Sequence, residues 1–207
     1  ITAGGSCDIQ IEFAPVATGL QTDTIDIAYN NGVSVVNVTR DVQGTGLATA
    51  VISISEVDPY DYGTQPLGSV TQHTFTLTNT GGAPATGIAG SGLASPFRFE
   101  GGAYPGTSGT CAGVLAAAAT CNIVVEYAPV AANGLDTDSI LIDYNDGAAA
   151  QQSARDVQGT SVTPANLSIS EINPYSYGTL AVGDNQAHVF VVTNSGGFVA
   201  SAMMDWI

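Results

Sequence analysis

The sequence predicts an all-β fold in which β-sandwich units of about 115 residues follow one another along the chain. Three observations carry this prediction: blocks of sequence that recur at one spacing, side chains that alternate between apolar and polar, and turn sequences rich in Asn and Gly. Alternation with a period of two is typical of half-buried strands, because successive side chains of a strand point to opposite faces. No segment shows the 3.6-residue period of an amphipathic helix.

The repeat consists of blocks that return 115 residues later. Residues 40–45 return as residues 155–160, and both read RDVQGT. The other recurring blocks are residues 52–56 with 167–171, 58–64 with 173–179, 73–75 with 188–190, and 79–82 with 194–197. A fixed period of this kind indicates tandem copies of one structural module.

The repeat also sets the expected domain boundaries. Residues 1–49 are the C-terminal part of one repeat, residues 50–163 form a complete repeat, and residues 164–207 are the N-terminal part of a further repeat. A sandwich cut at either end would expose unpaired strands, so we expect the chain to be a segment of a longer protein. Met203, Met204 and Trp206 would then pack in an incomplete sandwich or against another chain.

Each alternating segment of the complete repeat predicts a strand. Phe75 and Leu77 alternate with threonines. Cys121, Ile123, Val125 and Tyr127 alternate with Asn122 and Glu126. The expected strands are residues 51–56, 72–79, 85–90, 97–101, 120–128, 138–145 and 152–159. Hairpin turns are expected at residues 30–32 and 145–147, where Gly supplies a positive φ. Seven short strands in about 114 residues favour a β-sandwich.

Several motifs of the complete repeat keep a characteristic order. They are Tyr62-Gly63-Thr64, Gly68, His73-x-Phe75-x-x-x-Asn79-x-Gly81-Gly82, Pro96-Phe97-Arg98-Phe99, Cys111, residues 121–129, and Val157-Gln158-Gly159-Thr160. This order resembles bacterial ASH-type domains, the abnormal-spindle/hydin-like immunoglobulin folds also known as choice-of-anchor repeats. The resemblance implies a seven- or eight-stranded immunoglobulin-like sandwich that serves as a spacer or adhesion module and has no catalytic residues. Residues 198–207 depart from the matching residues 83–92.

The charge of the chain excludes two classes of partner. It has three basic and eighteen acidic residues, a net charge of −15, and no Lys. Binding to nucleic acid or to an anionic membrane surface depends on Lys and Arg, so neither is expected. No apolar run approaches the roughly eighteen residues of a membrane span, so no membrane insertion is expected in this segment.

The three cysteines suggest one disulfide and half of another. Cys111 and Cys121 would flank a turn between neighbouring strands, and a disulfide closing so short a loop contributes roughly 2–3 kcal/mol. Cys7 is equivalent to Cys121, so its partner would precede Ile1, outside the chain. The alternative is buried free thiols in a reducing compartment.

Charged and aromatic residues near the ends of each repeat are candidates for contacts between repeats. They are Arg40, Asp41, Tyr60, Tyr62, Arg155, Asp156, Tyr175 and Tyr177. The guanidinium groups would clamp a carboxylate or backbone carbonyls at the junction, or else form solvated edge pairs of little energetic weight. One tyrosine of each pair would pack inward, and the other would seal the contact with the preceding repeat or form a carbohydrate platform.

Acids and histidines beside the first strand have weaker interpretations. Glu56, Asp58 and Asp61, with Glu171 in the next copy, are candidate ligands for Ca²⁺, which prefers oxygen donors. The alternative is surface charge, with no cofactor. His73 and His188 are interpreted as surface or edge-strand residues, too far apart to share a metal ion.

Taken together, these features predict a non-enzymatic structural segment of an extracellular or cell-surface protein. Its repeats would stack end to end as the spacer of a fibre, stalk or filament, with neighbouring repeats and other copies of the chain as partners. No Ser, His and acid arrangement and no phosphate-binding loop is present in the sequence. The alternatives are an adhesin that recognises a glycan or a protein, and an accessory region of a secreted enzyme.

Overall fold

The computed structural model describes residues 1–203 and confirms the all-β prediction: its regular elements are strands and a single 3-10 turn. The elements are β1 (Gly19–Asn30), β2 (Val35–Gly46), β3 (Ile52–Ile54), β4 (Tyr60–Pro66), β5 (Thr71–Asn79), β6 (Ala85–Ser91), β7 (Phe97–Phe99), η1 (Glu100–Gly102), β8 (Val114–Leu115), β9 (Thr120–Tyr127), β10 (Gly134–Asn145), β11 (Ala150–Val162), β12 (Leu167–Ile169) and β13 (Val192–Asn194). Met204 and Trp206, for which packing was predicted, lie outside the described residues, and Met203 is exposed.

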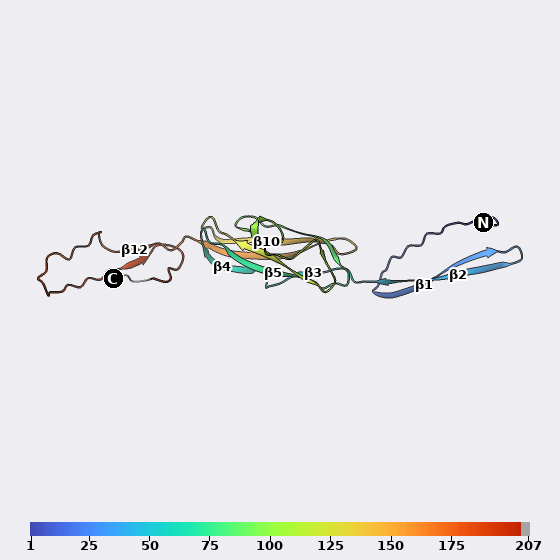
Figure 1. The fold of residues 1–207 in the computed structure, drawn as a ribbon, viewed down its shortest axis with the longest axis horizontal. Coiled ribbons are helices and arrows are strands. Elements are labelled where there is room, and N and C mark those ends of the chain that lie inside the picture. Colours follow the sequence, from blue (N-terminus) through green and yellow to red (C-terminus); the bar gives the residue numbers. More distant parts are fainter. Residues whose placement is uncertain (204–207) are drawn as a thin grey trace.

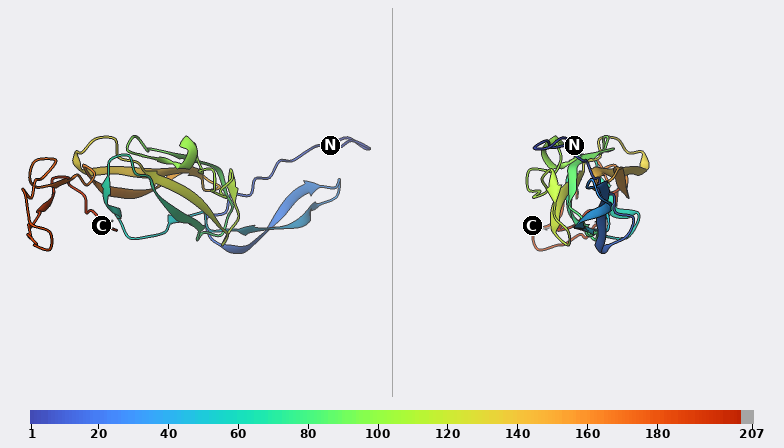
Figure 2. Two further views of the ribbon diagram at one scale, coloured as in Figure 1. Left: turned by 60° about the vertical axis from the view of Figure 1, so that its left-hand side comes forward. Right: turned by 90° about the vertical axis from the view of Figure 1, so that its right-hand side faces the viewer.

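The chain forms three parts in a row (Figure 1). An N-terminal arm, residues 1–49, carries the β1–β2 hairpin; a central body, residues 50–162, contains nine strands from β3 to β11; and a C-terminal arm, residues 163–203, carries β12 and β13. The two arms extend from opposite ends of the central body, as the turned view also shows (Figure 2). The molecule is therefore elongated.

The central body consists of two sheets. One has the strand order β4-β11-β10-β6-β8 and the other has the order β3-β5-β9-β7. All pairings are antiparallel except that of β4 with β11, which is parallel. From β3 to β10, strands that are neighbours in the sequence belong to different sheets, whereas β10 and β11 pair within one sheet.

The core lies between these two sheets. Phe75 and Leu77 of β5 and Ile140 and Ile142 of β10 are fully buried, because the apolar positions of each strand alternate onto its inner face. Burying one such side chain is worth roughly 1.5–3 kcal/mol. The ring of Tyr62 on β4 lies 5.7 Å from that of Tyr127 on β9, so aromatic side chains from opposite sheets meet. The two sheets therefore pack face to face, as in a β-sandwich.

Both hairpin turns lie where the Asn- and Gly-containing sequences predicted them. Gly32 between β1 and β2 has φ 96°, and Gly147 between β10 and β11 has φ 99°, a conformation that glycine adopts without steric cost. Asp146 fixes its turn by accepting hydrogen bonds from the backbone N–H groups of Ala148 (2.8 Å) and Ala149 (2.7 Å). These N–H donors hold the pKa of the Asp146 carboxyl below its usual value.

Two strands escaped prediction, and two predicted strands are shorter than expected. The strand predicted over residues 51–56 spans only Ile52–Ile54. β4 has no period-two alternation and contains Gly63 with φ 71°, yet it pairs along β11, whose thirteen residues offer a free edge. β8 has only two residues and pairs with β6. The strand expected over residues 97–101 ends at Phe99, because residues 100–102 form the 3-10 turn. Tertiary pairing therefore decides where these strands form and end.

The arms repeat pairings of the central body. β1 and β2 place Ile25 opposite Arg40, just as β10 and β11 place Ile140 opposite Arg155. Likewise β12 and β13 pair Leu167 with Asn194, as β3 and β5 pair Ile52 with Asn79. Because each arm has only one strand pair, apolar side chains that are buried in the body, such as the counterpart of Ile142, remain exposed there.

Candidate functional site

Hydrogen bonds connect the two sheets along the open edge of β3. β3 has a strand partner only on one side, β5. On the other side, the carbonyl oxygen of Ile52 accepts a hydrogen bond from Ser153 Oγ, and that of Ile54 accepts one from Arg155 Nη2 at 2.7 Å. The N–H of Ile52 donates to the phenol oxygen of Tyr144 at 3.3 Å. Side chains of β10 and β11 thus satisfy backbone groups that an edge strand leaves unpaired.

This geometry corrects the prediction for Arg155 and Asp156, which were expected to clamp neighbouring repeats. Besides Ile54, the Arg155 guanidinium lies 3.9 Å from the Asp58 carboxylate. Asp156 accepts a hydrogen bond from Ser139 Oγ, and its N–H donates to Asp58 Oδ1 at 3.0 Å. All of these partners belong to the central body.

The corresponding pair in the N-terminal arm also makes local contacts. Asp41 Oδ1 accepts a hydrogen bond from Thr24 Oγ1 at 2.8 Å across the β1–β2 pair. Arg40 lies opposite Ile25 in the same pair and is exposed. The contacts of Asp41 therefore stay within the arm.

The predicted tyrosine contacts between repeats are likewise contacts within one part of the chain. Tyr62 is buried and its hydroxyl donates to the carbonyl oxygen of Val125 at 2.9 Å. Burial raises the pKa of the Tyr62 phenol well above its ordinary value. Tyr60 stacks on the imidazole of His73, with ring centroids 4.0 Å apart. One tyrosine of the pair does pack inward, but the other covers a histidine of the same body.

The C-terminal arm arranges the same side chains in the same way. Tyr175 stacks on His188 with ring centroids 4.1 Å apart, and Tyr177 meets Tyr175 edge to face at 4.9 Å. Neither contact reaches the central body, so Tyr175 and Tyr177 do not join neighbouring parts through these rings. The aromatic group is a local feature of each copy.

His73 is not the surface or edge-strand residue that the sequence predicted, whereas His188 lies outside the strands of the C-terminal arm and its prediction stays open. His73 lies on β5, an interior strand of its sheet, and its Nε2 is 3.4 Å from Glu56 Oε1. His188 Nε2 is 3.5 Å from Glu171 Oε1. Both glutamates have a positive φ, 78° at Glu56 and 75° at Glu171, which is uncommon for a residue with a Cβ. The stacked tyrosine explains why a polar side chain is tolerated on an inner face.

The three acids proposed as calcium ligands have separate protein partners. Glu56 faces His73, Asp58 accepts from Asp156 N–H, and Asp61 Oδ2 accepts from the amide of Gln158 at 3.0 Å. Over residues 1–203, no group of three or more His, Cys, Asp or Glu side chains is arranged to hold a metal ion. The structure thus gives the predicted calcium site no shared set of ligands.

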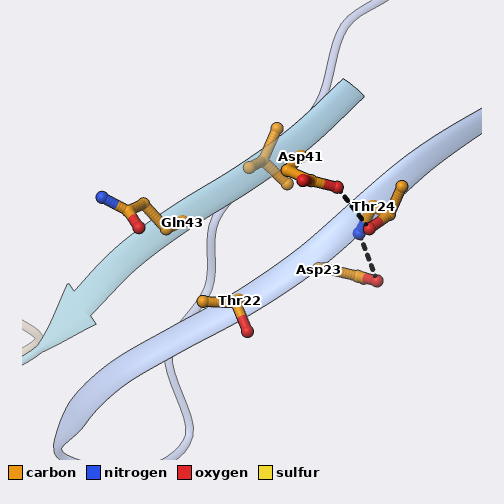
Figure 3. Close-up of a pocket in the computed structure, with 6 residues that line it drawn as sticks. Thr22, Asp23, Thr24, Asp41 and Gln43 are labelled. Carbon is orange, nitrogen blue, oxygen red and sulfur yellow. Dashed lines mark hydrogen bonds between the residues drawn. The ribbon is translucent and has the colours of Figure 1, made fainter. Parts of the chain in front are cut away.

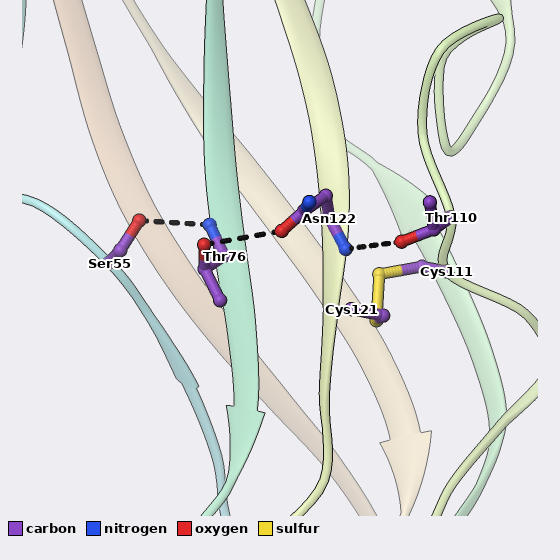
Figure 4. Close-up of a disulfide and its surroundings, with 6 residues drawn as sticks. All are labelled: Ser55, Thr76, Thr110, Cys111, Cys121 and Asn122. Atoms are coloured by element: carbon purple, nitrogen blue, oxygen red, sulfur yellow. Dashed lines mark hydrogen bonds between the residues drawn. A yellow bond between two sulfur atoms is a disulfide. The ribbon is translucent and has the colours of Figure 1, made fainter.

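Cys111 and Cys121 form a disulfide whose Cα atoms are 4.9 Å apart (Figure 4). The bond joins the loop before β8 to the start of β9, and Cys111 is buried against the core. Beside it, the N–H of Asn122 donates to Thr110 Oγ1 at 2.9 Å, which holds the same loop to β9. Cys7 is exposed and carries a free thiol, and its partner outside the chain stays a prediction.

Two shallow hollows occupy equivalent places on the β1–β2 and β10–β11 pairs. The first, of about 600 Å³, is lined by Thr22, Asp23, Thr24, Asp41, Val42 and Gln43 (Figure 3). The second, of about 230 Å³, is lined by the counterparts of these residues and by Pro59. Both are open and lined by carboxylates and hydroxyls, and neither contains a histidine or a cysteine that could act as a base or nucleophile.

Among residues 1–203, Asn79 is the one fully buried amide side chain, and its role was not foreseen in the sequence. Its Oδ1 accepts hydrogen bonds from the N–H groups of Val51 (3.2 Å) and Gly81 (3.0 Å). Its Nδ2 donates to the carbonyl oxygens of Ala83 (2.9 Å) and Leu115 (3.1 Å). The side chain thus connects the residue before β3 to the loop after β5 and to β8. A signal was available in the sequence, because residues 79–82 return as residues 194–197.

No helix of the described residues is both long and apolar enough to cross a membrane.

Comparisons with known proteins leave the family open. No protein-family model matches the chain, and no curated protein sequence matches it. Among solved structures, the VesB protease of Vibrio cholerae is similar with a TM-score of 0.43 and 17% identity over 53% of this chain, which spans 31% of the VesB chain. A protein of unknown function from Porphyromonas gingivalis W83 is similar with a TM-score of 0.42 and 12% identity, over 71% of this chain and 68% of the other. Likenesses this distant carry no functional conclusion for this chain.

Proposed function

We propose that this chain is a structural segment of an extracellular protein, in which immunoglobulin-like sandwich repeats of the ASH type stack end to end as a spacer. The observation that carries the proposal is the agreement between the arms and the central body. Strand pairs 115 residues apart have the same register, and the three parts lie in a row (Figure 1). An elongated chain of equivalent units, each in contact mainly with its neighbours, is the architecture of a spacer.

Two further features support a spacer outside the cell. The Cys111–Cys121 disulfide is typical of proteins exposed to an oxidising compartment. A net charge of −15 with no Lys makes free copies repel one another, which keeps a long thin protein soluble.

Electron microscopy of the native material that carries this chain tests the proposal. A sandwich whose longest strand has thirteen residues, each rising about 3.3 Å, would give an axial spacing on the order of 40 Å. We expect thin fibres or stalks with that spacing. Compact particles, or short molecules without a regular spacing, would contradict the spacer role and favour an adhesin or an enzyme's accessory region.

A further inference from the structure

We infer that the turn formed by Asn79, Gly81 and Gly82, with its counterpart Asn194, Gly196 and Gly197, is the surface on which each unit receives the linker from the unit before it. We call these two sites the Asn-Gly-Gly turns. The inference rests on the proposed function, since it assigns to the turn the task of fixing the direction of one unit relative to the next. The partner is a short peptide of the same chain, and both turns hold theirs in this structure.

The first Asn-Gly-Gly turn lies against the linker that leaves β2. A Cβ atom at Gly81 would lie 2.6 Å from Ala50 Cα and closer still to the carbonyl oxygen of Thr49. A Cβ atom at Gly82 would lie 3.3 Å from both the nitrogen and the carbonyl oxygen of Ala48. Backbone therefore packs directly on backbone here, so closely at Gly81 that only glycine fits, and tightly at Gly82.

The second Asn-Gly-Gly turn reaches the last strand of the central body. A Cβ atom at Gly197 would lie 3.1 Å from Cβ of Val162, the final residue of β11. The N–H of Gly197 lies 2.9 Å from Oγ1 and 3.1 Å from the carbonyl oxygen of Thr163, and donates to both. A Cβ atom at Gly196 would lie 2.7 Å from Ala165 Cα. The C-terminal arm thus contacts the central body through this turn.

The asparagine side chain holds turn and linker together at both places. Asn194 Oδ1 accepts hydrogen bonds from the N–H groups of Asn166 and Gly196, both at 3.0 Å, as Asn79 Oδ1 accepts from Val51 and Gly81. Each following residue adds a backbone bond, from Thr80 N–H to the Val51 carbonyl and from Ser195 N–H to the Asn166 carbonyl, both at 2.8 Å. The same network therefore forms twice, 115 residues apart.

Little free chain remains between one unit and the next. β2 ends at Gly46 and Ala48 is already packed on Gly82, so Leu47 alone lies between them. At the second junction, Val162 and Thr163 are themselves in contact with Gly197. A flexible linker needs several residues without such contacts. The Asn-Gly-Gly turn therefore restricts the linker, so that each unit keeps a fixed direction relative to the unit before it.

Two substitutions test this role, each with the same control. Gly82→Val and Gly197→Val place a branched side chain against the linker, whereas Gly113→Val places it where no atom lies within 4 Å. The readout is amide hydrogen exchange, followed by mass spectrometry, on the peptides that contain residues 46–52 and 162–167. Ala50 and Val51 are suited to it because their N–H groups donate to Asp146 O and to Asn79 Oδ1.

We expect exchange in the adjoining linker to rise about fivefold or more in Gly82→Val and Gly197→Val, the effect of losing about one hydrogen bond. Exchange in β9 and β10 should stay unchanged, and Gly113→Val should resemble the parent. Gly197→Val keeps the test decisive if Gly82→Val unfolds the body, because Gly197 lies in the C-terminal arm. Linker exchange that equals the parent's in Gly197→Val would overturn the inference. The fibre images test the proposed function separately, because linker exchange is measured on the isolated chain.

Discussion

Arg155 on the last strand of the central body donates a hydrogen bond from Nη2 to the carbonyl oxygen of Ile54 on its first strand, at 2.7 Å and 101 residues away in sequence. The two strands belong to opposite sheets, so this bond closes the sandwich along an edge where no strand pairing exists. The Arg155 side chain is only 16% exposed, which makes its partners hard for water to replace.

Replacing Arg155 with Met therefore destabilises the central body. We expect the free energy of unfolding to fall by about 1–3 kcal/mol, because a hydrogen bond from a charged donor to a half-buried carbonyl is lost. Urea denaturation measures the change. Gln152→Met is the matched control, since Gln152 lies on the same strand but bonds Asp143 on the exposed face. Equal stability of Arg155→Met and Gln152→Met would show that the edge contact is unimportant.

Removing the disulfide lowers stability for a different reason. The bond closes a loop with a sequence separation of ten residues, and opening such a loop increases the entropy of the unfolded chain by an equivalent of roughly 2–3 kcal/mol. We expect Cys111→Ser combined with Cys121→Ser to lower the thermal midpoint under non-reducing conditions. Cys7→Ser should leave it unchanged, because Cys7 is free and exposed. A loss in Cys7→Ser as large as that in the double variant would contradict this account.

High pH unfolds the body through its buried phenols. Burial raises the pKa of Tyr62 and Tyr127 well above the ordinary value, and that of Tyr104 to about 12. A raised pKa in the folded state means that stability is present below the unfolded value of about 10 and is lost as pH rises above it. The free energy of unfolding should therefore fall between about pH 10 and pH 12.

Absorbance at 295 nm checks this expectation. Ionisation of the buried phenols should coincide with the loss of circular dichroism, and Tyr62→Phe should reduce the alkaline loss of stability. Ionisation of all eight tyrosines in a chain that stays folded would be inconsistent with these pKa shifts.

Acid weakens the hydrogen-bonded network around the Glu126 carboxylate, on the outer side of β9. Hydrogen bonds from the Gln72 amide at 2.9 Å and from Arg98 Nε at 2.7 Å hold the pKa of Glu126 below its usual value, the bond from Gln72 having the larger effect. A lowered pKa contributes stability above the unfolded value of about 4.3, and this contribution disappears as pH falls through the folded pKa.

Gln72→Leu should therefore raise the pKa of Glu126 and reduce stability at neutral pH more than it does in acid, where Glu126 is protonated in both states. Carbon-detected NMR titration of the Glu126 carboxyl measures the shift directly. Gln151→Leu serves as the control, because its amide bonds Asp146 and not Glu126. An unchanged titration of Glu126 in Gln72→Leu would remove Gln72 from the network.

Part of this fold follows from neighbouring residues alone. The alternation around Phe75 in β5 and around Ile123 in β9 identifies half-buried strands, because a strand sends every second side chain to the same face. The turn sequences at residues 30–32 and 145–147 identify two hairpins, because the glycine in each can take a positive φ. Such signals act over two to four residues and can be read without knowing the fold.

The candidate sites depended on distant residues and could not be read in that way. Arg155 and Asp156 were assigned to a junction because they recur near the end of each repeat, but their partners lie about one hundred residues earlier. Asn79 and Gly81 recur in the sequence, but their role could not be read there, because the linker on which they pack comes from another part of the chain.

By itself the sequence determined that this protein is all-β, strongly acidic and internally repetitive, since composition and period are properties of the chain. Only the tertiary structure decided that β4 is a strand, that Arg155 closes an edge and that His73 lies beneath Tyr60. The physical reason is that each of these depends on which surfaces meet when two sheets pack, and the polar groups at their edges must then find partners wherever the fold supplies them.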